Sequence, residues 1–190
     1  MRNMNDLLRI VCSYLNKKKM EYAIIGGIAV LAHGIPRTTM DLDIIVQVDQ
    51  AAIDGFVLHL KKKGFFADAE DARDALRERT HFTAQDKRSG LRVDIKGVYN
   101  EMDRRTMMRR MVVRHNGLKM SVETPEDLIT AKLVYGSDQD IRDAEGVFLR
   151  QKGRLDMKYL AAACRANGVA RELAAMVKRV GRYKEQGSGN

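Results

Sequence analysis

The chain begins with hydrophobic patterns of two different periods. Two segments carry apolar residues every three or four positions, which is typical of amphipathic helices: residues 3–19 and 49–63. Four others are short apolar or alternating runs, which are typical of strands: residues 22–25, 40–48, 80–84 and 91–99. The dipeptide Asn116-Gly117 predicts a hairpin turn within residues 112–122. This mixture predicts an α/β (α+β) fold for the first part of the chain.

The pattern changes at Thr124-Pro125. Thr124 can cap a helix that has Pro125 at its first position and acidic residues in its first turn. Four helical segments follow: residues 125–135, 138–151, 156–166 and 169–183. We therefore predict a core over residues 1–122, a helical region over 123–184 and a disordered tail over 185–190.

Two aspartates interrupt the apolar strand predicted over residues 40–48. Because side chains alternate along a strand, Asp41 and Asp43 point to one face while Leu42 and Ile44 point to the other. Two carboxylates about 6–7 Å apart on one face repel each other and are costly to desolvate. Mg²⁺ (or Mn²⁺) favours such oxygen ligands, and Mg²⁺ binds through one or two carboxylates together with substrate phosphates. The pair therefore predicts a metal site.

A glycine pair precedes this strand. Gly26-Gly27 ends the strand 22–25, and residues 28–33 follow as a short predicted helix that stops at Gly34. Glycines let backbone N–H groups approach a ligand closely, and the start of a helix favours negative charge. We therefore expect Gly26 and Gly27 to bind phosphate.

Gly-Gly, a helix and then Arg-x-Thr-x-Asp-Leu-Asp resembles the nucleotidyltransferase superfamily with the polymerase-beta-like fold. The likeness is greatest to its minimal bacterial branch, which includes the AbiEii-type toxins of toxin–antitoxin systems. The residues that carry the resemblance are Gly26, Gly27, Arg37, Thr39, Asp41 and Asp43. It implies a mixed sheet flanked by helices, with a C-terminal helical bundle after it. Many members have Gly-Ser in place of Gly26-Gly27, so this chain lacks one hydroxyl that could hold a phosphate.

The resemblance also implies a reaction and roles for single residues. A nucleoside monophosphate would pass from an NTP such as ATP to an acceptor hydroxyl, with Asp41 and Asp43 holding the metal. The family calls for a third catalytic carboxylate on a neighbouring strand, and Asp94 occupies the fitting place in the strand 91–99. The alternative for Asp94 is a solvated residue paired with Arg92 or Lys96.

Three further residues are candidates for contact with the triphosphate. Arg37 and Thr39 belong to the first motif, although Arg37 could instead form a local salt bridge. Lys132 lies in a Pro-led helix followed by Asp140 and Asp143, which is similar to the family's C-terminal signature. The alternative for Lys132 is a solvent-facing helix residue, and we expect the two aspartates to cap or brace the next helix rather than to bind metal.

Composition bears on partners and location. The 190 residues are 45% hydrophobic, enough for a substantial core, and 34 basic against 25 acidic residues give a net charge of +9. This excess favours a polyanionic partner such as RNA, although an ordinary basic surface explains it equally well. The arginine-rich segment 104–114 also has two possible interpretations. Its arginines could contact phosphate, or they could form a basic surface around an edge strand. We expect Cys12 and Cys164 to be reduced and buried.

The sequence contains no apolar stretch typical of a signal peptide or membrane span, so we expect a cytoplasmic protein without membrane contact. RNA, for example a tRNA end, is the favoured acceptor, and a protein hydroxyl is next. The protein could belong to a toxin–antitoxin system with an antitoxin-type partner chain. The second hypothesis is a non-catalytic binding protein of the same fold, such as an antitoxin or regulator. Intact Asp41, Asp43 and Asp94 favour the enzyme.

Overall fold

A computed structural model of the chain describes residues 2–187, of which the backbone alone is described from 182 onward. It divides into two compact units at Glu123–Thr124. The first contains residues up to 29 together with 37–123, and the second contains 30–36 together with the rest from 124. This boundary lies next to the one predicted at 122–123. The segment 30–36 joins the helical unit because Gln151 Nε2 donates to the His33 carbonyl at 2.9 Å and Ile35 packs against Gly146.

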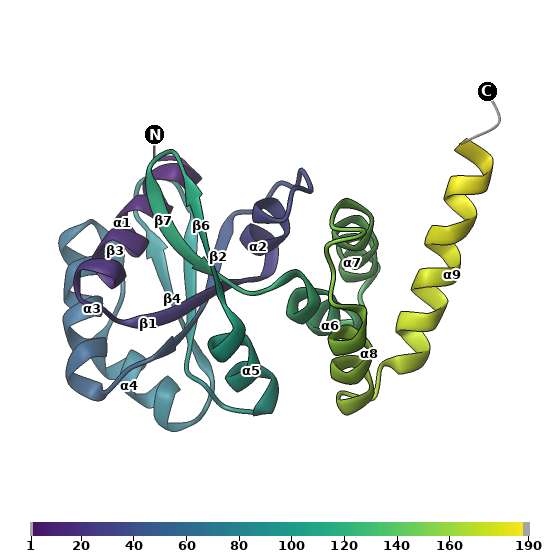
Figure 1. Cartoon of the computed structure of the whole chain (residues 1–190). Coiled ribbons are helices and arrows are strands. Elements are labelled where there is room, and N and C mark those ends of the chain that lie inside the picture. The colour runs from purple at the N-terminus through teal and green to yellow at the C-terminus, as the bar shows by residue number, and fades with distance from the viewer. Residues whose placement is uncertain (1, 188–190) are drawn as a thin grey trace. The chain divides into compact units, whose positions relative to one another are not determined.

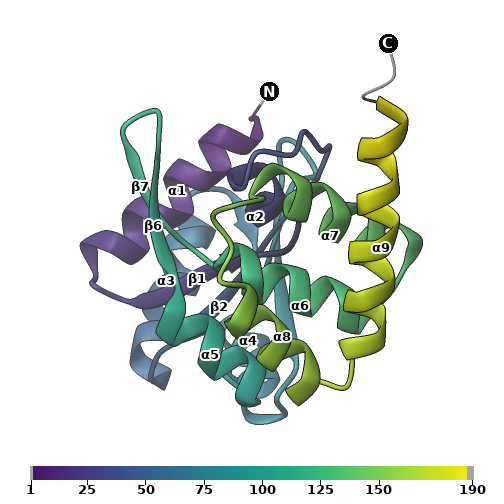
Figure 2. The ribbon, with the colours of Figure 1, turned by 45° about the vertical axis from the view of Figure 1, so that its right-hand side comes forward.

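The first unit is built on a mixed sheet. Its seven strands are β1 (Glu21–Ile25), β2 (Asp41–Gln47), β3 (Phe65–Phe66), β4 (His81–Asp86), β5 (Arg92–Lys96), β6 (Met111–His115) and β7 (Leu118–Val122), in the order β3-β4-β5-β2-β1-β7-β6. β2 pairs with β5, and β1 with β7, in parallel, whereas the other neighbours are antiparallel. The β6–β7 hairpin forms one edge of the sheet (Figure 2).

Helices cover both faces of this sheet (Figure 1). α1 (Met4–Lys17), α3 (Gln50–Lys62) and α4 (Ala69–Arg77) lie on one face, where apolar side chains of β2 such as Leu42 and Ile44 are buried. α5 (Glu101–Arg109) lies on the other, where Met107 packs against Ala23 and Ile45. Asp41 and Asp43 share the face of Ile45 because strand side chains alternate. The two carboxylates therefore lie on the α5 side, beyond the apolar cluster.

The second unit is helical. It consists of α6 (Pro125–Tyr135), α7 (Asp138–Arg150), α8 (Met157–Ala166) and α9 (Ala170–Gly187), while α2 (Gly26–Ala32) is shared between the units. α6 packs against α7 and α8, and α9 contacts both of these helices. Thr124 caps α6 by accepting the Asp127 N–H, with Pro125 at the first position, as predicted. No helix in the described residues is both long enough and apolar enough to cross a membrane.

The mixed α/β fold predicted from the sequence is confirmed. The prediction that Cys12 and Cys164 are buried free thiols is also confirmed. The segment 104–114 differs from the expected edge strand, because α5 occupies its first half and β6 begins only at Met111. The tail predicted over 185–190 stays a prediction: α9 runs to Gly187, and residues 188–190 lie outside the described residues.

Candidate active site

Three carboxylates lie on one face of two neighbouring strands. β2 and β5 run parallel in a register that sets Asp43 beside Asp94 and Asp41 beside Arg92. Partners in register point to the same face, and neighbouring strands are about 4.8 Å apart. All three aspartates are partly exposed. The structure thus brings Asp94 to the face of Asp41 and Asp43, next to the second of them.

Asp41 is paired with a cation, whereas Asp94 is bonded to a hydroxyl group. Arg92 Nε donates to Asp41 Oδ1 at 2.7 Å, and this bond, the charge of Asp41 and the nearby charges of Asp94 and Asp43 raise the pKa of Arg92. Asp94 Oδ1 accepts a 2.5 Å hydrogen bond from Thr83 Oγ1. Among the described side chains neither neighbouring cation forms an ion pair with Asp94, since Arg92 binds Asp41 and Lys96 binds Asp103.

On the other side of β2, Gly26 closely approaches Asp43. Gly26 follows β1 directly, beyond Ile25, which is the register partner of Asp43. Its φ of +65° is in the left-handed region, and a Cβ atom there would lie 2.5 Å from Asp43 Oδ2. Only glycine fits such a position without strain. Gly26 N–H donates to Glu123 Oε1 at 3.0 Å, and Glu123 is buried. Glu123 therefore fixes the turn that adjoins Asp43.

Thr39 and Gly27 lie next to each other at the start of β2. Thr39 Oγ1 accepts from Asp41 N–H at 3.3 Å and donates to the Asp41 carbonyl at 3.1 Å. A Cβ atom at Gly27 would lie 3.0 Å from the same hydroxyl oxygen. The hydroxyl of Thr39 thus positions Asp41. Arg37 lies two residues earlier, in the loop between α2 and β2. A phosphate contact by Arg37 or Thr39 stays a prediction.

Lys132 belongs to the second unit, where it is buried on α6. Its Nζ lies 2.7 Å from Asp140 Oδ1 and 3.0 Å from Asp143 Oδ2. Asp140 also forms a capping box with Ser137 at the start of α7. The two aspartates therefore brace α6 against α7, as expected, and the amine of Lys132 is held by both of them. Contact of Lys132 with a nucleotide stays a prediction.

The carboxylates fit a divalent cation by chemistry, although their present side-chain positions do not enclose one. In the described part of the chain, no three His, Cys, Asp or Glu side chains converge as a metal cluster. Mg²⁺ needs only one or two carboxylates, because water and substrate phosphates complete its shell. Asp43 and Asp94, side by side on one face, offer that minimum, and Asp41 can join them when its bond to Arg92 opens.

No protein-family model matches the sequence, and no curated protein matches it. Solved structures do resemble this one. An antigenic nucleotidyltransferase-like protein from Paracoccidioides brasiliensis is 22% identical with a TM-score of 0.57, covering 90% of each chain. ANT(2″)-Ia in complex with adenylyl-2″-tobramycin is 11% identical with a TM-score of 0.58, over 84% of this chain and 95% of that one. The chain has the nucleotidyltransferase fold. The lincosamide antibiotic adenylyltransferase LnuA shares it, with 15% identity, a TM-score of 0.53 and coverage of 76% of this chain and 96% of that one.

Three residues of this nucleotidyltransferase fold were not singled out from the sequence. They are Glu123, which binds the Gly26 amide, Arg92, which pairs with Asp41, and Thr83, which donates to Asp94. Arg92 was recognised only as a neighbour of Asp94. Glu123 and Gly26 are 97 positions apart, so no local pattern joins them. The alternation of β4 does carry a signal for Thr83, since it places Thr83 opposite the buried side chains Phe82 and Ala84.

Proposed function

We propose that the chain is a metal-dependent nucleotidyltransferase. It moves a nucleoside monophosphate from an NTP to an acceptor hydroxyl and releases pyrophosphate. The observation that supports this most is the register of β2 and β5, which sets Asp43 and Asp94 side by side. On the other side of Asp43 lies Gly26, where no Cβ atom fills the space.

Asp41 and Asp43 would hold Mg²⁺ or Mn²⁺, with Asp94 as a shared ligand of a second ion. When bound, such ions neutralise phosphate charge and stabilise the attacking and leaving oxygens of an in-line displacement. Thr83 donates to Oδ1 of Asp94, which keeps a second lone pair for the ion, and Oδ2 would accept the proton of the acceptor hydroxyl. When the triphosphate binds, the hydrogen bond from Arg92 to Asp41 would break and Arg92 would bind a phosphate group instead, because guanidinium groups bind phosphate well.

The glycine turn would orient the triphosphate. The Gly26 N–H is committed to Glu123, whereas the Gly27 N–H lies in the first turn of α2, where amides have no intrahelical acceptor. Gly27 is therefore the better candidate of the two for a phosphate oxygen. Arg37 and Thr39, at the entry to β2, are the next candidates. For Lys132, in the second unit, nucleotide contact is a separate proposal that requires the release of one of its aspartates.

For the acceptor we favour the hydroxyl of an RNA, such as a tRNA end, because the chain carries a net charge of +9. A protein hydroxyl is the next candidate. ANT(2″)-Ia and LnuA are adenylyltransferases or resistance factors for antibiotics, so a small-molecule hydroxyl belongs in the same test. A role in a toxin–antitoxin system, with an antitoxin-type partner, would follow from an RNA or protein acceptor.

The proposal is tested by incubating the protein with each α-³²P-labelled NTP and Mg²⁺, together with total RNA, cell lysate or aminoglycosides. Label on one class of acceptor is expected. Asp43→Asn and Asp94→Asn should each reduce transfer at least about 10²-fold, the scale of losing one essential electrostatic group. Asp71→Asn, at an exposed position of α4, is the matched control and should leave transfer unchanged.

Binding separates the enzyme from the non-catalytic alternative. NTP and Mg²⁺ at about 100 times Kd should stabilise the wild type by about 2.7 kcal/mol. Asp41→Ala/Asp43→Ala should lose this stabilisation. Stabilisation without transfer to any acceptor would favour the binding protein. The transferase proposal is wrong if the wild type shows neither stabilisation nor transfer. It is also wrong if the Asp41→Ala/Asp43→Ala variant keeps both stabilisation and transfer.

A further inference from the structure

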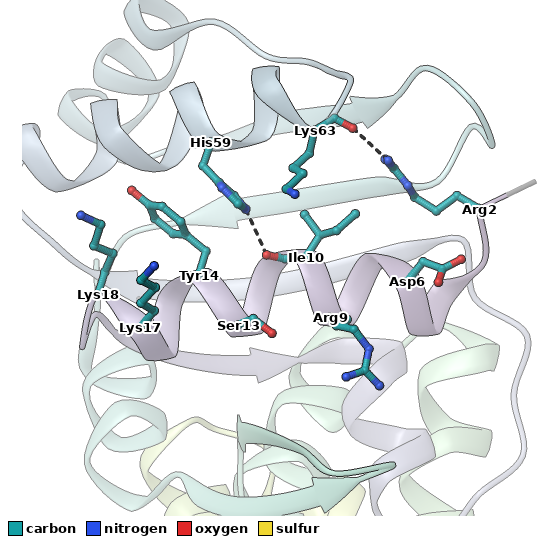
Figure 3. Close-up of a pocket in the computed structure, with 10 residues that line it drawn as sticks. All are labelled: Arg2, Asp6, Arg9, Ile10, Ser13, Tyr14, Lys17, Lys18, His59 and Lys63. Carbon is teal, nitrogen blue, oxygen red and sulfur yellow. Dashed lines mark hydrogen bonds between the residues drawn. The ribbon is translucent and has the colours of Figure 1, made fainter.

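A basic groove runs between α1 and α3 in the first unit (Figure 3). These helices cover the face of the sheet opposite to the three carboxylates. We define the α1–α3 groove by Arg9, Tyr14, Lys17, Lys18, His59 and Lys63. The groove has a volume of about 670 Å³ and is open to solvent. We propose that the α1–α3 groove binds single-stranded RNA. This goes beyond the proposed transfer and does not depend on it.

Apart from Arg2, which lines the same hollow and pairs with Asp86, the cations of the groove are not compensated by a carboxylate. Arg9, Lys17, Lys18 and Lys63 form no ion pair with any residue in the described part of the chain. The one carboxylate in the lining, Asp6, accepts the Asn3 N–H in the capping box of α1. Three of these cations are lysines without an ion pair, and the guanidinium of the fourth, Arg9, donates to the Asn116 carbonyl at 3.4 Å. Together they create a positive potential along α1 and at the end of α3. A polyanion is therefore the ligand class that this groove favours.

The spacing of the cations favours an extended ligand. Lys17 and Lys18 lie at the C-terminal end of α1, Arg9 lies about two turns earlier, and Lys63 comes from the end of α3 (Figure 3). The helical rise from Arg9 to Lys17 is about 12 Å. A single phosphate group could contact both of these residues only if both side chains were fully extended toward each other. A strand of several nucleotides can place successive phosphates along the groove.

The middle of the groove is aromatic and rigid. The rings of Tyr14 and His59 are stacked with centroids 4.3 Å apart, and Tyr14 also stacks on Phe56 at 5.6 Å. His59 Nε2 donates to the Ile10 carbonyl at 3.2 Å, which fixes the imidazole. A positive groove with aromatic side chains is the arrangement by which proteins bind single strands without sequence preference.

Helix capping and membrane binding account for this groove less completely than RNA does. A lysine at a helix C-terminus offsets the helix dipole, which accounts for Lys17, Lys18 and Lys63 but not for Arg9. A membrane surface would need apolar side chains to insert, yet none of the exposed large hydrophobic residues in the described ranges lines this groove. RNA accounts for the charge, the length and the rings together.

The test is fluorescence anisotropy with a labelled 12-nucleotide single-stranded RNA, without NTP, so that its outcome is separate from that of the transferase assay. Lys17→Gln/Lys18→Gln removes two groove cations. Lys158→Gln/Lys178→Gln, at exposed positions of α8 and α9, removes the same charge elsewhere. If each groove lysine neutralises one phosphate, the slope of log K against log [salt] should fall by about 1.4. Affinity at 0.1 M salt should then fall about 25-fold.

The control variant should bind like the wild type, and circular dichroism should show all three proteins folded. Equal losses in the two variants would mean that net charge alone drives binding, and would overturn the proposal. So would the absence of wild-type binding at 0.1 M salt. Vesicles containing phosphatidylserine serve as a separate probe: if the groove variant loses vesicle binding and keeps RNA binding, the partner is a membrane and the proposal is wrong.

Discussion

The contact between Gly26 and Asp43 allows a direct test of the candidate site. In Gly26→Ala, the new Cβ atom would lie 2.5 Å from Asp43 Oδ2, well inside the distance that two such atoms tolerate. Alanine must also adopt the φ of +65° that the turn requires. The substitution therefore combines backbone strain with displacement of a carboxylate that we assign to the metal.

Gly117→Ala is the matched control for the strain. Gly117 has a φ of +76° and open space around its missing Cβ atom. A left-handed alanine costs about 1–2 kcal/mol, and we expect this loss of unfolding free energy in the control. Gly26→Ala should lose a further 1–3 kcal/mol or so, because an extra methyl group in a filled space costs about that much.

Urea unfolding followed by circular dichroism measures both values, and a double-mutant cycle isolates the contact. With Asp43→Ala in place, Gly26→Ala should cost no more than Gly117→Ala, since the carboxylate is gone. Transfer activity of Gly26→Ala should fall while that of Gly117→Ala stays at the wild-type level. Equal costs for the two glycine variants, or a cycle without coupling, would refute the close approach of Gly26 to Asp43.

Two predictions concern buried groups outside this contact. Lys132→Met leaves Asp140 and Asp143 without their cation, so urea unfolding at pH 7 should show a loss of about 3–5 kcal/mol. Burial raises the pKa of Asp140, but hydrogen bonds from Lys132 and Ser137 outweigh it and hold that pKa below its usual value. The stabilisation by ionised Asp140 is present above about pH 4 and is lost as the pH falls through the lowered pKa. The difference in unfolding free energy between wild type and Lys132→Met should therefore become smaller in acid. A difference that does not change with pH would contradict this prediction. Burial raises the pKa of Cys12 to about 12, so its reaction with DTNB at pH 8 should be limited by unfolding, and rapid labelling would contradict this.

The secondary structure was readable from the sequence where its cause is local. The apolar stripe of α1 and the Asn116-Gly117 turn depend on neighbouring residues, and both lie where predicted. α5 was missed because its buried face has one large apolar residue, Met107, among arginines. The sequence does contain a signal for the start of α5, because Asn100 caps the helix by accepting the Asp103 N–H.

The site was only partly readable, for a different reason. Alternation along one strand is enough to put Asp41 and Asp43 on a common face. It cannot tell which strand lies beside β2, and for Asp94 the family resemblance supplied that neighbour. Contacts such as that of Glu123 with Gly26 depend on the order of strands in the sheet. They are products of tertiary structure and leave no periodic signal in the sequence.

The order of strands gives Asp43 its central position. β2 lies between β1 and β5, so one neighbour brings the glycine turn to Asp43 and the other brings Asp94. A shift of β5 by one residue would turn Asp94 to the opposite face and expose its apolar neighbours. The burial of Val93 and Ile95 against the helices opposes that shift. The packing of the far face therefore holds the two carboxylates together, although it touches neither of them.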